Sequence, residues 1–144
     1  MLARVHTGLA LRSYGMGDVA GGRRQFAQAL ALDPARAQST QDFARSLSHY
    51  AMHLPVGSPL QYVDTVLGNL PDQAQPLARV RPQVVSEVNI GCAFQDFAAG
   101  RRSLTVRRVL TALRHRPTWL KNRGVVSIFF KSLLGLMPQA QRLS

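Results

Sequence analysis

Apolar side chains recur with the period of an α-helix along most of the chain. In residues 2–14, leucine and valine alternate with alanine on a helical spacing, and residues 23–32 place apolar side chains at i, i+3, i+4 and i+6. The alternation in residues 80–88 is short and lies between helical neighbours, so we expect no strand. The same period predicts further helices at about 37–53, 60–69, 82–98, 103–115 and 123–136. The pattern therefore predicts an all-α fold made of helical hairpins with additional packed helices.

Glycine and proline mark the ends of these helices. Gly17 can adopt the left-handed conformation that closes a helix. Pro34 ends the second helix, because the residue before a proline is pushed out of the helical region. The segment 55–59 and Pro117 give further breaks. These signals predict a tight hairpin at residues 3–36.

The hairpin at 3–36 carries a recognisable order of bulky, small and aromatic residues that ends on a proline. Its positions are Leu9, Ala10, Tyr14, Gly17, Gly22, Phe26, Ala29 and Pro34. This order resembles a tetratricopeptide unit, with His6 in place of the tryptophan and Gly22 in place of the usual alanine. Small residues let two antiparallel helices approach closely. We therefore expect Phe26 to be buried against Leu9 and Ala10, with Leu9 filling the groove between the helices.

The pattern returns in a more eroded form 83 residues later, the distance from Gly17 to Gly100. Thr105 and Cys92 are its poor matches. It predicts a second hairpin at 86–119, separated from the first by two further helices. A regular solenoid needs at least three contiguous repeats, and a chain of 144 residues has the length of one domain. We therefore expect a single helical domain over residues 1–144, ending in an apolar helix at 123–137.

Three segments carry a second resemblance that extends over the whole chain: residues 17–34, 62–71 and 117–128. Together they resemble the helical region that follows the catalytic domain in some bacterial family-2 glycosyltransferases. In such enzymes an upstream domain with a paired-aspartate metal motif binds the nucleotide sugar, and this sequence contains no Asp-x-Asp. The resemblance implies a non-catalytic C-terminal part or accessory piece, with a catalytic glycosyltransferase domain as its protein partner.

Residue types that catalysis needs are scarce. Residues 15–20 have the glycine spacing of a dinucleotide loop, but they follow a helix instead of a strand, and we interpret them as a hairpin turn. His49 and His53 share a helix face, a spacing that can hold zinc, yet no cluster of Cys, Asp or Glu completes a ligand set. Glu87 is the single glutamate, and Cys92 is expected to be a small buried hydrophobe. We predict no catalytic residue, cofactor or metal.

Charge is distributed unevenly. The formal net charge is +11; residues 1–96 hold eight cations and all seven acids, whereas residues 97–144 hold ten cations and no acid. Within the basic part, residues 124–137 are apolar except for a stripe of small or polar side chains. This helix is either a core helix docked against the second hairpin or a face shared with a membrane or a protein partner. The candidate face consists of Val126, Phe129, Phe130 and Leu133 with Arg101, Arg108, Lys121, Arg123 and Lys131.

These features indicate a cellular location and three compatible functions. A single cysteine permits no internal disulfide, and no run of 18 apolar residues exists, so we expect a cytoplasmic protein, peripheral at the inner membrane if the basic face meets anionic lipid. Three functions are compatible with the sequence. They are a glycosyltransferase module, a free-standing tetratricopeptide-like adaptor that binds protein in a helix-lined groove, and a nucleic-acid binder suggested by the pI of about 11.5. The last is least favoured because no known nucleic-acid-binding motif is present.

Overall fold

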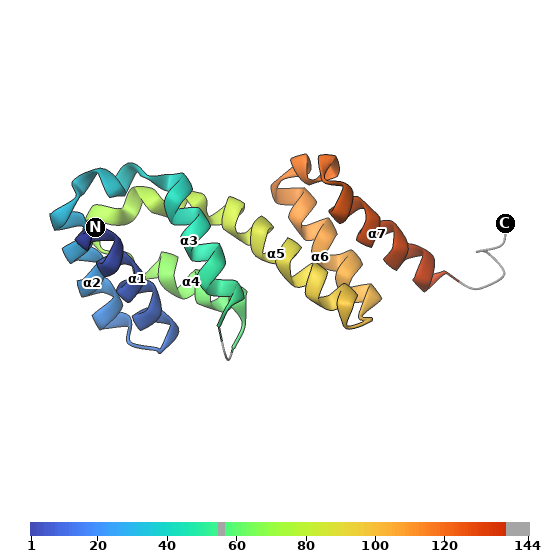
Figure 1. The fold of residues 1–144 in the computed structure, drawn as a ribbon, viewed down its shortest axis with the longest axis horizontal. Helices are drawn as coiled ribbons and strands as arrows, with labels where there is room; N and C mark the ends of the chain where they lie inside the picture. Colours follow the sequence, from blue (N-terminus) through green and yellow to red (C-terminus); the bar gives the residue numbers. More distant parts are fainter. Residues whose placement is uncertain (55–56, 138–144) are drawn as a thin grey trace. The chain divides into compact units, whose positions relative to one another are not determined.

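Every regular element in the described part of the chain is a helix (Figure 1), which confirms the all-α fold class. The computed structural model describes residues 1–54 and 57–137. The chain divides into two compact units: unit 1, Met1–Val84, and unit 2, which begins at Val85. Each unit is built around its own set of helices.

Unit 1 contains four α-helices and two 3₁₀ helices: α1 (Leu2–Gly15), α2 (Val19–Leu32), η1 (Pro34–Gln38), α3 (Thr40–Met52), α4 (Pro59–Gly68) and η2 (Asp72–Val80). Helix α5 (Arg81–Ala98) begins in unit 1 and continues into unit 2, which also holds α6 (Arg102–His115), η3 (Pro117–Lys121) and α7 (Arg123–Leu136). All seven predicted helices occur. The 3₁₀ helices were not predicted, because η1 and η3 have only five residues each and η2 contains Pro76, which interrupts the helical pattern.

The first hairpin is formed by α1 and α2, which pack against each other. Phe26 is 2% exposed, as predicted, and Ala10 and Ala29 are fully buried. Phe26 also meets Phe43 of α3 edge-on, with ring centroids 5.6 Å apart. Leu9 does not fill the groove between the helices, since 41% of it is exposed. The buried stripe of α1 runs through Ala3, Ala10, Leu11 and Tyr14, which places Leu9 outside it.

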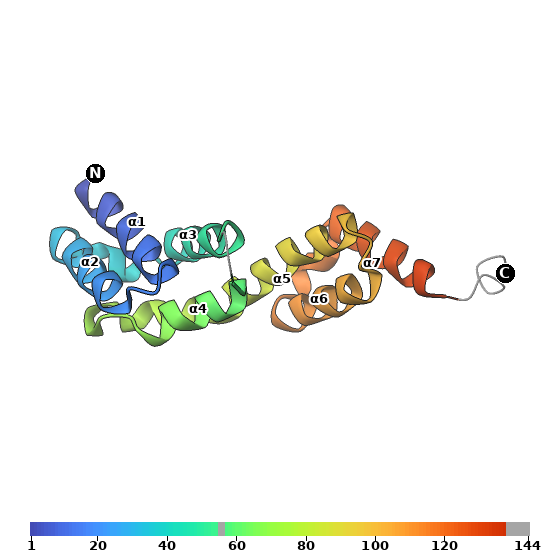
Figure 2. The ribbon, with the colours of Figure 1, turned by 90° about the horizontal axis from the view of Figure 1, so that it is seen from below.

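Helix α4 and η2 complete unit 1 by covering α1 and α3 (Figure 2). The tyrosine of α4 fixes this contact, because the Tyr62 hydroxyl donates a hydrogen bond of 2.8 Å to the backbone oxygen of Leu11. Leu47 of α3 is fully buried. The inward side chains of α4 are Tyr62, Val63, Val66 and Leu67. An amphipathic helix therefore supplies a large part of the unit 1 core.

Unit 2 has its own apolar core, to which three helices contribute: Ile90 and Ala93 of α5, Val109 and Ala112 of α6, and Val125 and Ile128 of α7. Ser86 links the end of α6 to η3. Its hydroxyl donates to the backbone oxygen of Ala112 at 2.9 Å and accepts from the Trp119 indole at 2.7 Å. Helix α7 is thus docked in this core through one face.

The two units share one backbone plan at the predicted offset of 83 residues. Gly17 and Gly100 both have positive φ, +85° and +77°. Gly17 donates its N–H to the oxygen of Tyr14 at 3.1 Å, and Gly100 donates to Phe97 at 3.0 Å. The correspondence continues beyond the hairpins, since η1 and α3 in unit 1 are matched by η3 and α7 in unit 2. The repeated element is therefore a hairpin plus a 3₁₀ turn and a third helix.

Candidate functional site

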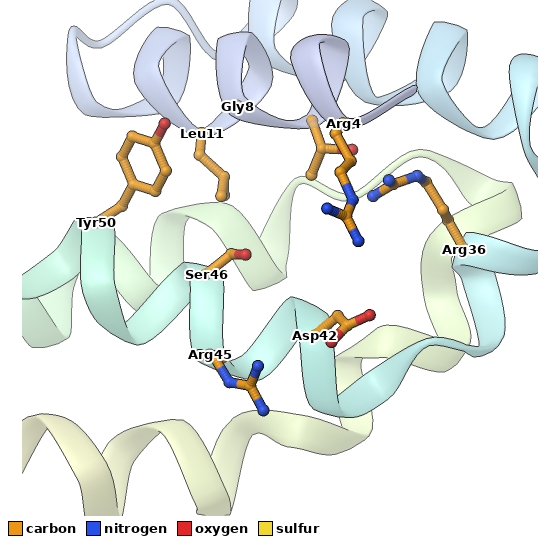
Figure 3. A pocket seen from close by; sticks show the side chains of 9 residues that line it. Arg4, Gly8, Leu11, Arg36, Asp42, Arg45, Ser46 and Tyr50 are labelled. Carbon is orange, nitrogen blue, oxygen red and sulfur yellow. The ribbon is translucent and has the colours of Figure 1, made fainter. Parts of the chain in front are cut away.

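Two adjoining cavities lie along α1 and α3 in unit 1. One has a volume of about 350 Å³ and is shown in Figure 3. The other has a volume of about 470 Å³. Both are lined by Leu11 and Tyr50, so they adjoin, and the two together are called here the α1–α3 groove.

Helical spacing aligns the side chains of this groove. On α1, Arg4, Thr7, Gly8 and Leu11 follow at i, i+3, i+4 and i+7. Helix α3 contributes residues that share one side of it for the same reason, and His53 follows its last residue. These α3 residues are Asp42, Arg45, Ser46, His49 and Tyr50. The groove is thus lined by one stripe from each helix, with η1 closing one end through Arg36.

Two arginines dominate the first cavity. In Figure 3 the guanidinium groups of Arg4 on α1 and Arg36 on η1 are turned toward each other. Arg36 has an ion pair with Asp33 at 3.6 Å, yet its Nε is buried without a hydrogen-bond partner. Of the described residues that line this cavity, one is an acid, Asp42, and three are arginines. Converging guanidinium groups with an excess of positive charge favour an anionic group, which they can bind through charge-assisted hydrogen bonds.

The middle of the groove is shaped by Gly8 and Tyr50. A Cβ atom at Gly8 would stand 3.3 Å from the Tyr50 hydroxyl oxygen, so the glycine lets this hydroxyl approach α1. Figure 3 shows the Tyr50 ring pointing from α3 toward α1. The tyrosine thus places a hydroxyl, which can donate or accept a hydrogen bond, between the two cavities.

The second cavity has a mainly apolar lining, with Leu11, Met16 and Leu54 among its residues. His49 and His53 also line it, with their ring centroids 4.3 Å apart and their rings tilted by 33°, and His53 Nδ1 lies 2.7 Å from the backbone oxygen of His49. Within residues 1–54 and 57–137, no group of three His, Cys, Asp or Glu side chains could hold a metal ion. The two histidines are lining residues of the apolar cavity.

No family model, curated protein or solved structure matches this chain. None of its described helices is long and apolar enough to cross a membrane.

Residues 15–20 and Cys92, which the sequence also singles out, both have structural roles. Residues 15–20 form the turn between α1 and α2, as interpreted; there Asp18 accepts the N–H of Gly21 at 2.8 Å and caps α2. Cys92 is 6% exposed in unit 2. Burial raises the pKa of the Cys92 thiol, an effect that the nearby Arg108 opposes. The thiol therefore stays protonated at neutral pH, which is unfavourable for a nucleophile.

The basic candidates in unit 2 separate into two groups. Arg101 and Arg108 each form an ion pair of 2.8 Å with Asp96, whose side chain is 8% exposed. These two arginines hold α5 and α6 together, so their role is structural. The remaining cations, Lys121, Arg123 and Lys131, are exposed.

The apolar candidates on α7 also separate. Phe129 packs against the unit 2 core, and Val126 and Leu133 are half-buried. Phe130 is 55% exposed. Helix α7 is therefore docked in the unit 2 core through one face, as the first alternative expected, and its other face is exposed.

The sequence pattern did not indicate a functional role for Arg4, Arg36, Asp42 or Tyr50. A signal was present on α3, where polar residues recur at positions 42, 45, 46 and 49 beside the buried stripe. The pattern is also typical of a solvated helix face. Only the approach of α1 and η1 distinguishes a groove from such a face.

Proposed function

We propose that the chain is a non-catalytic interaction module whose α1–α3 groove binds an acidic segment of another protein. The observation that carries the proposal is the continuity of the groove, in which an arginine-lined cavity adjoins an apolar one through Leu11 and Tyr50. A carboxylate side chain fits between Arg4 and Arg36, because guanidinium groups pair with carboxylates through two parallel hydrogen bonds. A large apolar side chain fits the cavity beside Met16 and Leu54.

A binding role suits the chemistry of the groove better than catalysis does. Among the described residues, Asp42 is the only carboxylate that lines either cavity, so a pair of carboxylates for acid and base catalysis lacks its second member there. The two histidines and Arg12 line the apolar cavity, whereas Arg4, Arg36 and Arg45 line the other. The groove offers complementary charge and shape at two separate points, which favours recognition of a segment with two side chains some residues apart.

The resemblance to glycosyltransferase C-terminal regions suggests one partner to test first, a bacterial family-2 catalytic domain. This part of the proposal has the support of the three sequence segments alone. A free-standing adaptor would use the same groove with a different protein. We place either form in the cytoplasm, because the single cysteine gives no sign of an oxidising compartment.

Selection from a display library of random peptides on the purified chain tests the groove. We expect the selected peptides to combine an acidic residue with a large apolar one. Fluorescence polarisation then compares their affinity for the parent chain and for the Arg4→Ala, Arg36→Ala variant. Loss of two charge-assisted contacts should weaken binding at least ~30-fold, or about 2 kcal/mol.

A matched control removes the same charge elsewhere. Arg107 and Arg114 are exposed on α6, in unit 2, and their double alanine variant should bind the peptides within about twofold of the parent. Equal losses in both double variants would mean that peptides respond only to net charge. Unchanged binding by the Arg4→Ala, Arg36→Ala chain would show that the groove is not the site.

A further inference from the structure

Four positions that are buried in unit 1 correspond to exposed, large apolar side chains in unit 2. At the offset of 83 residues, side chains that are at most 9% exposed in the first copy are matched by side chains that are 41–63% exposed in the second. The pairs are Leu11 and Phe94, Ala37 and Leu120, Leu47 and Phe130, and Ala51 and Leu134. We call the set Phe94, Leu120, Phe130 and Leu134 the uncovered face.

The contacts of unit 1 account for the burial of its four residues. Helix α4 packs against α1 and α3, and η2 packs against η1 and α3. The Tyr62 hydroxyl binds the backbone oxygen of Leu11, the residue that corresponds to Phe94. In unit 1 the repeated element is therefore covered by an amphipathic helix and the turn that follows it. Residues 85–137 contain no element in the corresponding place, since α7 is the last helix that the structure describes.

We propose that the uncovered face of unit 2 binds an acidic amphipathic helix of a partner protein, in the position that α4 occupies in unit 1. This site lies outside the α1–α3 groove and does not depend on it. The internal repeat identifies the kind of occupant, because in unit 1 the same arrangement of helices is covered by the helix α4.

Charge on unit 2 specifies the acidic character of the helix. Lys121 follows Leu120 directly, and Lys131 follows Phe130, so cations border the apolar residues. The two acids of unit 2 in the described region are already paired, Asp96 with Arg101 and Arg108, and Glu87 with Arg116. A partner with acidic residues beside its apolar stripe would supply the missing carboxylates. A second copy of this chain is disfavoured, because each copy carries a formal net charge of +11.

Side-chain size adds a steric condition. In unit 1 small residues stand at two of these positions. Ala37 lies on η1, which packs against η2, and Ala51 lies on α3, which packs against α4 and η2. Their counterparts in unit 2 are Leu120 and Leu134. A helix that packs at the same distance must therefore have small residues opposite these two leucines. The expected partner has an apolar stripe interrupted by alanine or glycine and flanked by Asp or Glu.

A display library of amphipathic helical peptides, randomised at charged and apolar positions, is the probe for this site. The full chain is the target, and selected peptides are compared by fluorescence polarisation. We expect acidic helices that bind the parent chain and lose affinity at least ~10-fold with the Phe130→Ser, Leu134→Ser chain. Both side chains are more than half exposed, so this variant should fold. The Leu120→Ser, Leu134→Ser chain provides a second variant, and circular dichroism checks both.

Two control variants distinguish the uncovered face from the groove and from exposed apolar side chains in general. Leu2→Ser with Val5→Ser removes exposed apolar side chains from α1, and it should leave helix binding within about twofold of the parent. The Arg4→Ala, Arg36→Ala chain should also bind these helices normally, because its substitutions lie in the groove of unit 1. The proposal for the α1–α3 groove can therefore fail while the proposal for the uncovered face holds, and the uncovered-face proposal can fail while the groove proposal holds.

Three results would overturn the inference. The first is that every selected helical peptide binds the Phe130→Ser, Leu134→Ser chain and the Leu120→Ser, Leu134→Ser chain as tightly as it binds the parent. The second is sedimentation of the parent chain with vesicles of phosphatidylglycerol and phosphatidylcholine that is lost in the Phe130→Ser, Leu134→Ser chain, because the face would then be a membrane contact. The third is concentration-dependent dimerisation that the same substitutions abolish, seen by analytical ultracentrifugation.

Discussion

The Tyr14 ring covers the position where Gly22 would carry a side chain. A Cβ atom at Gly22 would stand 2.9 Å from the ring carbons Cγ and Cδ2. Tyr14 cannot move away freely, because its hydroxyl donates a hydrogen bond of 2.6 Å to the backbone oxygen of Asn69. The glycine that departs from the tetratricopeptide-like pattern is thus required by the tyrosine on the neighbouring helix.

Replacing Gly22 by alanine should destabilise the protein, although alanine is the better helix former by about 1 kcal/mol. Overpacking against an anchored ring costs about 1–3 kcal/mol, and we expect a net loss of about 1 kcal/mol or more. Urea unfolding followed by circular dichroism measures the difference. Gly68→Ala is the matched control, since a Cβ atom there meets no atom within 4 Å. Equal stability of the Gly22→Ala and parent chains would mean that Tyr14 adjusts without cost.

The Asp96 carboxylate should contribute more to stability than any exposed acid. It is 8% exposed and is paired at 2.8 Å with both Arg101 and Arg108. Asp96→Asn removes the charge that both hydrogen bonds depend on, and we expect a loss of about 1.5–3 kcal/mol in the free energy of unfolding.

Asp72→Asn serves as the comparison for Asp96. Asp72 pairs with Arg23 at 3.5 Å, and its side chain is 93% exposed. Surface pairs of this kind contribute little, so the change should stay within about 0.5 kcal/mol. A similar small effect for Asp96→Asn in thermal or urea unfolding would contradict the role assigned to the Asp96 pairs.

Alkaline pH should unfold the protein through its buried tyrosines. Burial raises the pKa of Tyr14 from 10.0 to about 12, with an opposing effect of Arg23. The unfolded state releases this proton near pH 10, whereas the folded state retains it. The stability that depends on neutral Tyr14 is therefore complete below pH 10 and decreases as the pH rises toward 12. Burial also raises the pKa of Tyr62, so the two tyrosines act in the same direction.

The Tyr14→Phe variant tests this pH dependence. It should lose about 1 kcal/mol at pH 8, because the hydrogen bond to Asn69 is gone. Between pH 9 and 11, its free energy of unfolding should fall less steeply than that of the parent. The background from lysine is small, since sixteen of the eighteen cations are arginines, which stay charged. Parallel pH profiles for the two chains would exclude Tyr14 as a source of alkaline unfolding.

The sequence by itself determined the local structure. The helical period located all seven α-helices, and Gly17 and Gly100 located two helix ends, where the left-handed conformation has little cost for glycine. The offset of 83 residues between these glycines was visible in the sequence because a turn depends on only a few neighbouring residues. The burial of Phe26 was predictable as well, since it lies between small residues on a strongly patterned hairpin.

Only the tertiary structure decided which apolar and charged side chains have partners. Leu47 and Phe130 occupy equivalent positions on α3 and α7, yet Leu47 is fully buried and Phe130 is 55% exposed. In the same way, the groove arginines Arg4 and Arg36 are separated by more than thirty residues in the sequence, and only the folded chain brings them to the same cavity. Burial and charge pairing depend on segments that are distant along the chain. A helical period shows only which side chains of one helix share a face, and not what packs against that face.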